Sequence, residues 1–219
     1  MTLFFDFGGC IDAPGIHTRT LFWYACLAEG MQQLAQRAAF QDAYTKADQR
    51  MMKTGEAKSL ALAEFNRHNA KLICEELGIA GAEKIGDRVT EQMRGYLADS
   101  RAALEKLHGK FELGIISNFT GNLEVILHEL LLRELFASVT ESYYAGASKP
   151  DERIFLEALG DRRPADCLYI GDNPVNDIAP AKKLGMKAVL IHPKGARKEC
   201  GADYYVEDLA AFASWIQNK

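Results

Sequence analysis

Short apolar runs, each ending in a polar or glycine-containing loop, recur along this 219-residue chain and restrict the folds open to it. They occupy residues 3–7, 113–117, 167–171 and 187–191. Such runs are typical of β-strands that are buried on both faces of a sheet. Helical patterns separate the later runs and occupy residues 122–133, 151–159 and 176–184. This alternation predicts an α/β fold with a Rossmann-like parallel sheet covered by helices.

Two weaker strand candidates lie at residues 138–142 and 204–206. In a parallel sheet the carboxyl ends of the strands lie at one edge, where open α/β folds bind their ligands. Asp6, Ser117 and Asp172 stand at or directly after the ends of three predicted strands. We therefore expect these three side chains to meet at one edge of the sheet.

The segment from residue 13 to residue 98 differs from the rest because it contains no convincing strand. Apolar residues recur there at helical spacing, for example Ile85, Val89, Met93 and Leu97. The sequence therefore predicts two domains, an α/β core formed by residues 1–12 and 99–219 and a helical cap formed by residues 13–98.

Composition and charge argue against several classes of function. Apolar residues make up 48% of the chain and charged residues 26%, as is ordinary for a globular protein. The net charge of -4 and the lack of a Lys/Arg run argue against a nucleic-acid partner. The sequence has neither a membrane-length apolar stretch nor a signal-peptide pattern, so we expect no membrane association. The five cysteines include no CxxC pair, which indicates reduced thiols in a cytoplasmic protein, and nothing indicates an oligomeric state.

Two segments at the ends of apolar strands carry groups suited to phosphate chemistry. They are residues 6–12 (DFGGCID) and 114–118 (GIISN). The Asp6 carboxylate can attack phosphorus if a cation screens its charge. Ser117 supplies a hydroxyl, and successive backbone N–H groups at this strand end can hold phosphate oxygens. Either motif taken alone is also typical of a turn or a helix cap.

Two further segments carry groups suited to phosphate chemistry, namely residues 148–151 (SKPD) and 168–177 (LYIGDNPVND). Lys149 can bridge a nucleophile and a phosphate, although a single loop lysine is usually a solvated charge. Asp172 follows an apolar strand and is the kind of hard oxygen ligand that Mg²⁺ binds. Asp177 is either a second acidic group near the metal or a helix cap.

In their order, chemistry and placement at strand ends, the four segments resemble the four motifs of the haloacid dehalogenase superfamily. Residues 13–98 occupy the position of that superfamily's helical cap. The resemblance implies an α/β Rossmann-like core with the cap inserted after the first motif. It also implies a Mg²⁺-dependent hydrolase that acts on a small phosphorylated metabolite.

The resemblance further implies a role for each motif residue. Asp6 would form an aspartyl-phosphate, Ser117 and Asn118 would bind phosphoryl oxygens, and Lys149 would orient Asp6 and bind phosphate. Asp6, the backbone carbonyl of Gly8 and Asp172 would hold Mg²⁺, and Asn173 and Asp177 would support that site. All of these roles follow from the resemblance alone.

The chain departs from the superfamily pattern at Gly8, where its phosphatases usually carry an aspartate that transfers protons. General acid–base catalysis is worth about 10²–10⁴-fold in rate. One explanation is a phosphatase with another proton source, for which Glu56 and His17 are candidates. A second is a phosphonatase, which needs a cap lysine such as Lys46, Lys53 or Lys58, or a 2-haloacid dehalogenase. The acidic fourth motif disfavours a dehalogenase, because attack on carbon needs no metal. A third is a non-catalytic homologue that binds phosphate or a protein.

Overall fold

A computed structural model describes residues 1–32, 37–192 and 200–218 of the chain. Within these residues six parallel strands form one sheet in the order β3-β2-β1-β4-β5-β6. The strands are β1 (Thr2–Phe5), β2 (Glu112–Ser117), β3 (Ser138–Glu141), β4 (Cys167–Gly171), β5 (Lys187–Ile191) and β6 (Tyr204–Val206). The chain therefore has the α/β, Rossmann-like fold that the sequence predicts.

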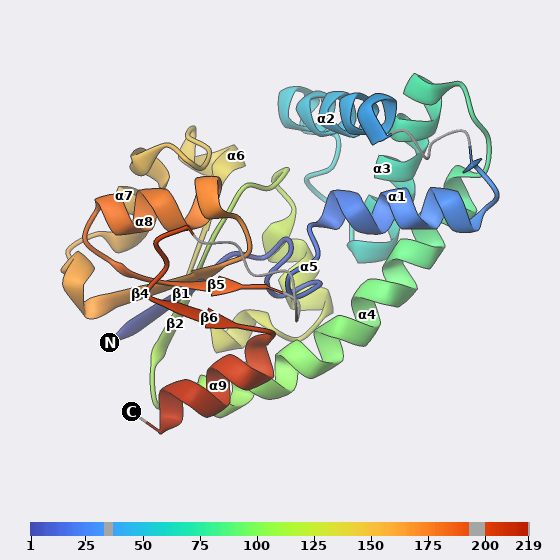
Figure 1. The fold of residues 1–219 in the computed structure, drawn as a ribbon. Helices are drawn as coiled ribbons and strands as arrows, with labels where there is room; N and C mark the ends of the chain where they lie inside the picture. Colours follow the sequence, from blue (N-terminus) through green and yellow to red (C-terminus); the bar gives the residue numbers. More distant parts are fainter. Residues whose placement is uncertain (33–36, 193–199, 219) are drawn as a thin grey trace.

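Helices cover both faces of this sheet (Figure 1). One face packs against α4 (Ala82–Leu107), α5 (Leu123–Glu129) and α9 (Leu209–Gln217), and the other against α7 (Glu152–Leu159) and α8 (Ala179–Lys183). Alternate residues of β1 point to opposite faces of the sheet, so Leu3 and Phe5 pack against the helices on the first face and Phe4 packs against those on the second. This double burial explains why the strands are apolar along their length. None of the described helices is long and apolar enough to cross a membrane.

The register of the three central strands aligns their carboxyl ends. Phe5 of β1 pairs with Ile115 of β2 on one side and with Ile170 of β4 on the other. The polar residues that follow these three positions consequently lie at one edge of the sheet. Because β2 and β4 flank β1 on opposite sides, this edge is the crevice in which open α/β sheets bind ligands.

In the segment predicted as a cap, helices joined by turns account for the regular structure of the described residues. It contains α1 (Thr18–Ala28), α2 (Arg37–Thr54), α3 (Leu62–Leu77) and the first part of α4, which together stand beside the sheet (Figure 1). Ile85, Val89, Met93 and Leu97 are all buried, as their helical spacing predicts. α4 continues without a break to pack against α9 beneath the sheet, so residue 98 lies inside one helix. The division into core and cap stays a prediction.

Several element boundaries differ from the sequence-based expectation. β1 ends at Phe5, because the carbonyl of Phe7 accepts the N–H groups of the next turn and bends the chain. The helix expected over residues 122–133 ends at Glu129, and Leu131 follows with a left-handed φ of 53°. The helix expected over residues 176–184 begins earlier, with a π-helical turn at Pro174–Ile178 followed by α8. Backbone hydrogen bonding thus fixes ends that apolar periodicity leaves open.

Candidate active site

The predicted site residues come together at the carboxyl edge of the sheet. Asp6 follows β1, Ser117 ends β2, and Asp172 follows β4. Lys149 comes from the loop before α7, and Asp177 from the π-helical turn after β4. Parallel strand register places the first three residues, whereas loop packing brings in the other two.

One oxygen of Asp6 is held by three donors. Asp6 Oδ1 accepts hydrogen bonds from the Ser117 hydroxyl at 2.7 Å and from the backbone N–H of Phe7 at 2.7 Å. It also lies 2.9 Å from Lys149 Nζ. Among the described residues, no group donates a hydrogen bond to Asp6 Oδ2. The carboxylate is therefore fixed in orientation while one oxygen stays available beside the cavity that Asp6 lines.

Lys149 is a buried cation between two carboxylates. Its Nζ lies 2.9 Å from Asp6 Oδ1 and 2.7 Å from Asp177 Oδ1, and only 2% of its side chain is exposed. Burial lowers the pKa of this ammonium, but the charges of Asp177 and Asp6 outweigh burial and raise it above its ordinary value. Lys149 therefore stays charged and partly offsets the acidic cluster.

Tyr169 is a site residue that the sequence-based reasoning missed. Lys149 Nζ donates a hydrogen bond to the Tyr169 hydroxyl at 2.9 Å. That hydroxyl has one hydrogen, and both the carbonyl of Ile116, at 3.0 Å, and Asp177 Oδ1, at 3.2 Å, lie within its reach. In the sequence Tyr169 looks like any other residue of a buried strand. The available signal is strand alternation, which places Tyr169 on the opposite face of the sheet from its neighbour Ile170.

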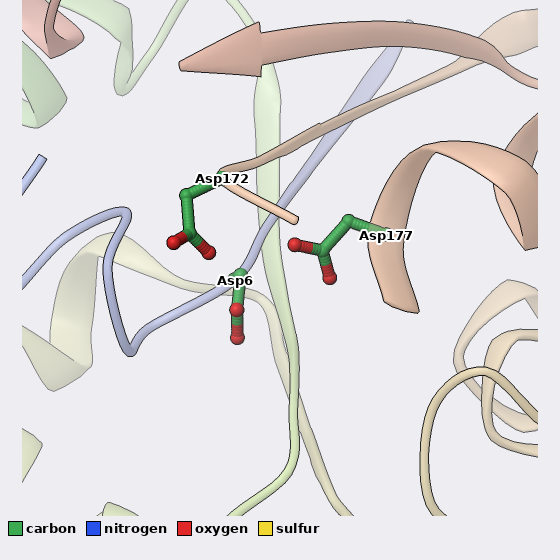
Figure 2. A group of neighbouring side chains, drawn as sticks. All are labelled: Asp6, Asp172 and Asp177. Atoms are coloured by element: carbon green, nitrogen blue, oxygen red, sulfur yellow. The ribbon is translucent and has the colours of Figure 1, made fainter. Parts of the chain in front are cut away.

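Three carboxylates form an acidic cluster, drawn in Figure 2, in which Asp6 follows β1 and both Asp172 and Asp177 follow β4. Asp6, Asp172 and Asp177 each place one oxygen within 4.8 Å of the others. Burial, followed by the charges of Asp177 and Asp6, raises the pKa of Asp172 well above its ordinary range. Burial also raises the pKa of Asp177, against the opposing charge of Lys149. Burial therefore disfavours the charged forms of Asp172 and Asp177.

The donor set fits a hard divalent cation. Among the described residues the Asp172 carboxylate makes no hydrogen bond, so both of its oxygens are available. Asp177, in contrast, is fully engaged, because Lys149 contacts Oδ1 and the N–H of Asn173 donates to Oδ2 at 2.9 Å. Asp6 and Asp172 are therefore the carboxylates able to hold an ion, and Asp177 is placed to support them.

Gly9 allows Asp172 to lie close to the first motif. Its φ is +80°, and a Cβ atom added there would lie 2.5 Å from Asp172 Oδ2. Neither the left-handed backbone nor this approach suits a larger residue. Gly8 differs from Gly9, since its φ lies outside the left-handed region.

The two predicted asparagines make structural hydrogen bonds. Asn118 Oδ1 accepts from the N–H of Lys149 at 2.7 Å, and Asn118 Nδ2 donates to the carbonyl of the same residue at 3.0 Å. Asn173 Oδ1 accepts from the N–H groups of Val175 and Asn176 and so caps the π-helical turn. Asn118 thus fixes the loop that carries Lys149, and its predicted contact with phosphate stays a prediction.

A cavity of about 230 Å³ lies over these groups. Part of its wall comes from the helical segment and consists of His17, Thr18, Arg19, Tyr44, Thr45, Asp48 and Phe65. Burial, and then the charge of Arg19, lowers the pKa of His17 to about 4. His17 Nδ1 also accepts the N–H of Arg19 at 3.1 Å, so the neutral ring carries its hydrogen on Nε2.

The other candidates from the cap do not line this cavity. Glu56 instead forms an ion pair with Arg50 on the protein surface. Lys46, Lys53 and Lys58 are likewise absent from the cavity wall that the described residues form. Among the described residues, none of these three lysines therefore stands where the cap lysine of a phosphonatase would act on a substrate in this cavity.

The chain is similar in sequence to proteins of one hydrolase family. The family model of haloacid dehalogenase-like hydrolases matches residues 1–185. The Drosophila melanogaster Rhythmically expressed gene 2 protein is 38% identical over 90 residues, which cover 39% of this chain and 35% of that protein. The human haloacid dehalogenase-like hydrolase domain-containing protein 3 is 43% identical over 81 residues, which cover 36% and 32%. The matched region thus spans about a third of the length of these relatives.

Solved structures of the same fold cover nearly the whole chain. A magnesium-bound HAD-hydrolase, YfnB from Bacillus subtilis, has a TM-score of 0.59 and 18% identity, and the match covers 99% of this chain and 98% of that one. A HAD phosphatase from Thermococcus onnurineus has a TM-score of 0.59 and 20% identity over 98% and 97%. A dehalogenase with an intermediate complex has a TM-score of 0.68 and 18% identity over 98% and 96%. By its family match, its fold and its motifs, the chain belongs to the haloacid dehalogenase-like hydrolases.

Proposed function

We propose that this protein is a Mg²⁺-dependent phosphatase that hydrolyses a small phosphate monoester through an aspartyl-phosphate on Asp6. The observation that carries the proposal is the state of the Asp6 carboxylate. Ser117, Phe7 and Lys149 hold one oxygen, and the other stays available beside Asp172. A carboxylate held in this way is a nucleophile with a fixed direction of attack.

The reaction would proceed in two displacements. Asp6 attacks phosphorus, the bond to the leaving oxygen breaks, and a proton neutralises that oxygen. Water then attacks the phosphorus of phospho-Asp6, releasing inorganic phosphate and restoring the carboxylate. Ser117 and Lys149, which already contact Asp6, would bind the phosphoryl oxygens as negative charge moves between the two groups.

Asp6, Asp172 and the backbone carbonyl of Gly8 would hold Mg²⁺, with Asn173 and Asp177 as supporting residues. When bound, Mg²⁺ would supply the positive charge that screens the carboxylates from an anionic phosphate. Without it, the one ammonium of Lys149 faces three carboxylates.

The cavity supports a small substrate. A volume of about 230 Å³ is below the range of about 300–1,000 Å³ that is usual for drug-sized ligands. Besides the phosphoryl group it has room for a short leaving group, bounded by polar groups and by the rings of Phe65 and Phe119. The partner that we propose is therefore a phosphorylated metabolite rather than a macromolecule.

The test is metal-dependent release of phosphate from a panel of small phosphomonoesters, with Mg²⁺ or with a chelator. We expect release by the wild type with Mg²⁺ and none by Asp6→Asn, whose folding is checked by circular dichroism. Asp166→Asn, an exposed aspartate paired with Arg163, is the matched control and should keep its activity. Chloride release from 2-haloacids without metal would indicate a dehalogenase instead. Phosphate binding without turnover would indicate a non-catalytic homologue.

A further inference from the structure

Asp12 is a buried carboxyl group with no part in the mechanism above. Only 1% of its surface is exposed, and it does not line the cavity. Asp12 Oδ1 accepts the N–H of Gly9 at 2.6 Å, and Asp12 Oδ2 accepts the hydroxyl of Thr18 at 2.9 Å. Thr18, the first residue of α1, does line the cavity. The pair therefore connects the cavity surface to an ionisable group behind it.

The hydroxyl of Thr18 stands in front of Gly8. A Cβ atom added to Gly8 would lie 3.2 Å from Thr18 Oγ1, and no other atom of the described residues outside its chain neighbours would lie within 4 Å. Gly8 is two residues from Asp6, and all three residues line the same cavity. A hydroxyl thus occupies the space that a side chain at position 8 would reach.

The hydrogen bond between Thr18 and Asp12 can run in either direction. While Asp12 is ionised, Thr18 must donate to it. Once Asp12 carries a proton, it can donate to Thr18 Oγ1, which frees the hydroxyl hydrogen of Thr18 to point into the cavity. Burial raises the pKa of Asp12 to about 7, so both states are populated near neutral pH.

Two other titratable groups on the cavity wall, His17 and Asp177, are less suited to donate a proton. His17 is neutral, because burial lowers its pKa to about 4. Asp177 is engaged by Lys149 and Asn173. Asp48 is the acidic residue of the helical wall, and burial raises its pKa too, so Asp48 is the competing proton donor.

We propose that Thr18 and Asp12 form the proton relay of the phosphatase, with Thr18 as the residue that meets the leaving oxygen. This proposal rests on the proposed function. As the bond between phosphorus and the leaving oxygen breaks, that oxygen takes the hydroxyl proton of Thr18, and Thr18 takes the proton of Asp12 Oδ2. In the second displacement the attacking water gives a proton to Thr18, which returns one to Asp12. Both protons are accounted for, and no further reactant is needed.

The experiment compares kcat/KM for an alkyl phosphate, glycerol 2-phosphate, with kcat/KM for p-nitrophenyl phosphate. An alkoxide needs a proton to leave, whereas p-nitrophenolate does not. Thr18→Val and Asp12→Asn should lower the alkyl-to-aryl ratio by about 10²-fold. Thr18→Ser, which restores the hydroxyl, should restore the ratio. Thr45→Val is the matched control, because Thr45 also lines the cavity but donates to the carbonyl of Gln41.

A pH profile separates proton transfer from a structural role. Asp12 faces the Gly9 N–H and the Thr18 hydroxyl, with Asp6, Asp172 and the phenol of Tyr44 as neighbouring titratable groups. In the wild type the alkyl-to-aryl ratio should fall as the pH rises through about 7, because ionised Asp12 has no proton to give. In Asp12→Asn the ratio should be low at every pH.

Equal losses on both substrates in Thr18→Val and Asp12→Asn would overturn the relay and leave the phosphatase proposal standing. So would a fall in the ratio in Asp48→Asn alone. A wild type that releases no phosphate from either substrate would overturn the phosphatase proposal and the relay with it.

Discussion

Replacing Asp12 by Asn should stabilise the protein at high pH and not at low pH. Burial raises the pKa of Asp12 from 3.8 to about 7, and each pKa unit corresponds to about 1.4 kcal/mol. A shift of about three units makes ionisation of Asp12 cost the folded state about 4 kcal/mol. Asn carries no charge, can accept the N–H of Gly9 and can donate to Thr18 Oγ1. The substitution therefore removes the cost without leaving a buried group unpaired.

Asp12 destabilises the folded state at high pH because folding raises the pKa of its carboxyl group. The folded state keeps the Asp12 proton at pH values where the unfolded chain has released it, so the wild type loses stability as the pH rises from about 4 to about 7. Above pH 7 the full cost applies, and below about pH 4 it vanishes. The free energy of unfolding of Asp12→Asn should consequently exceed that of the wild type by up to about 4 kcal/mol at pH 8, and the two values should agree near pH 4.

The assay is urea unfolding of both proteins from pH 4 to pH 8, with a chelator present so that metal binding does not add to stability. Other titrating groups cancel in the difference between the two curves. Asp166→Asn, at an exposed position, should show no such pH-dependent difference. A difference that is constant with pH, or a variant that is less stable at pH 8, would refute the reasoning. A variant that is more stable but slower on alkyl phosphates would show that the buried carboxyl serves function at the expense of stability.

Three further substitutions test the site. Gly8→Asp should raise the alkyl-to-aryl ratio of kcat/KM more in a Thr18→Val background than in the wild type. The reason is that the new carboxyl would occupy the space that the Thr18 hydroxyl now reaches. Equal gains in the two backgrounds would count against the relay. Gly9→Ala should raise the Mg²⁺ concentration for half-maximal activity by about 10-fold or more, because its Cβ would displace Asp172, and an unchanged Mg²⁺ titration would contradict this. Lys149→Met should lower the free energy of unfolding in urea at pH 7.5 by about 3–5 kcal/mol, since it leaves two buried carboxylates without their cation; a loss under about 1 kcal/mol would contradict the buried ion pair.

The sequence predicted the fold class and the site's location because both depend on local patterns. Apolar runs bounded by loops identify strands buried on both faces, and parallel register then brings their carboxyl ends together. Asp6, Ser117 and Asp172 could therefore be placed at one edge of the sheet from sequence alone. The helical spacing of Ile85 and Val89 predicted a buried helix face in the same way.

Only the tertiary structure decided which groups contact one another. Tyr169 contacts Lys149, and Thr18 contacts Asp12, because of how the surrounding elements pack. The periodicity of apolar residues does not predict that packing. The same holds for protonation, because burial among particular neighbours keeps His17 neutral and raises the pKa of Asp12 to about 7. The sequence by itself determined the types of chemical group and their strand ends. Folding determined the partners, the solvation and hence the charge of each group, since these depend on what lies within a few ångströms in space rather than along the chain.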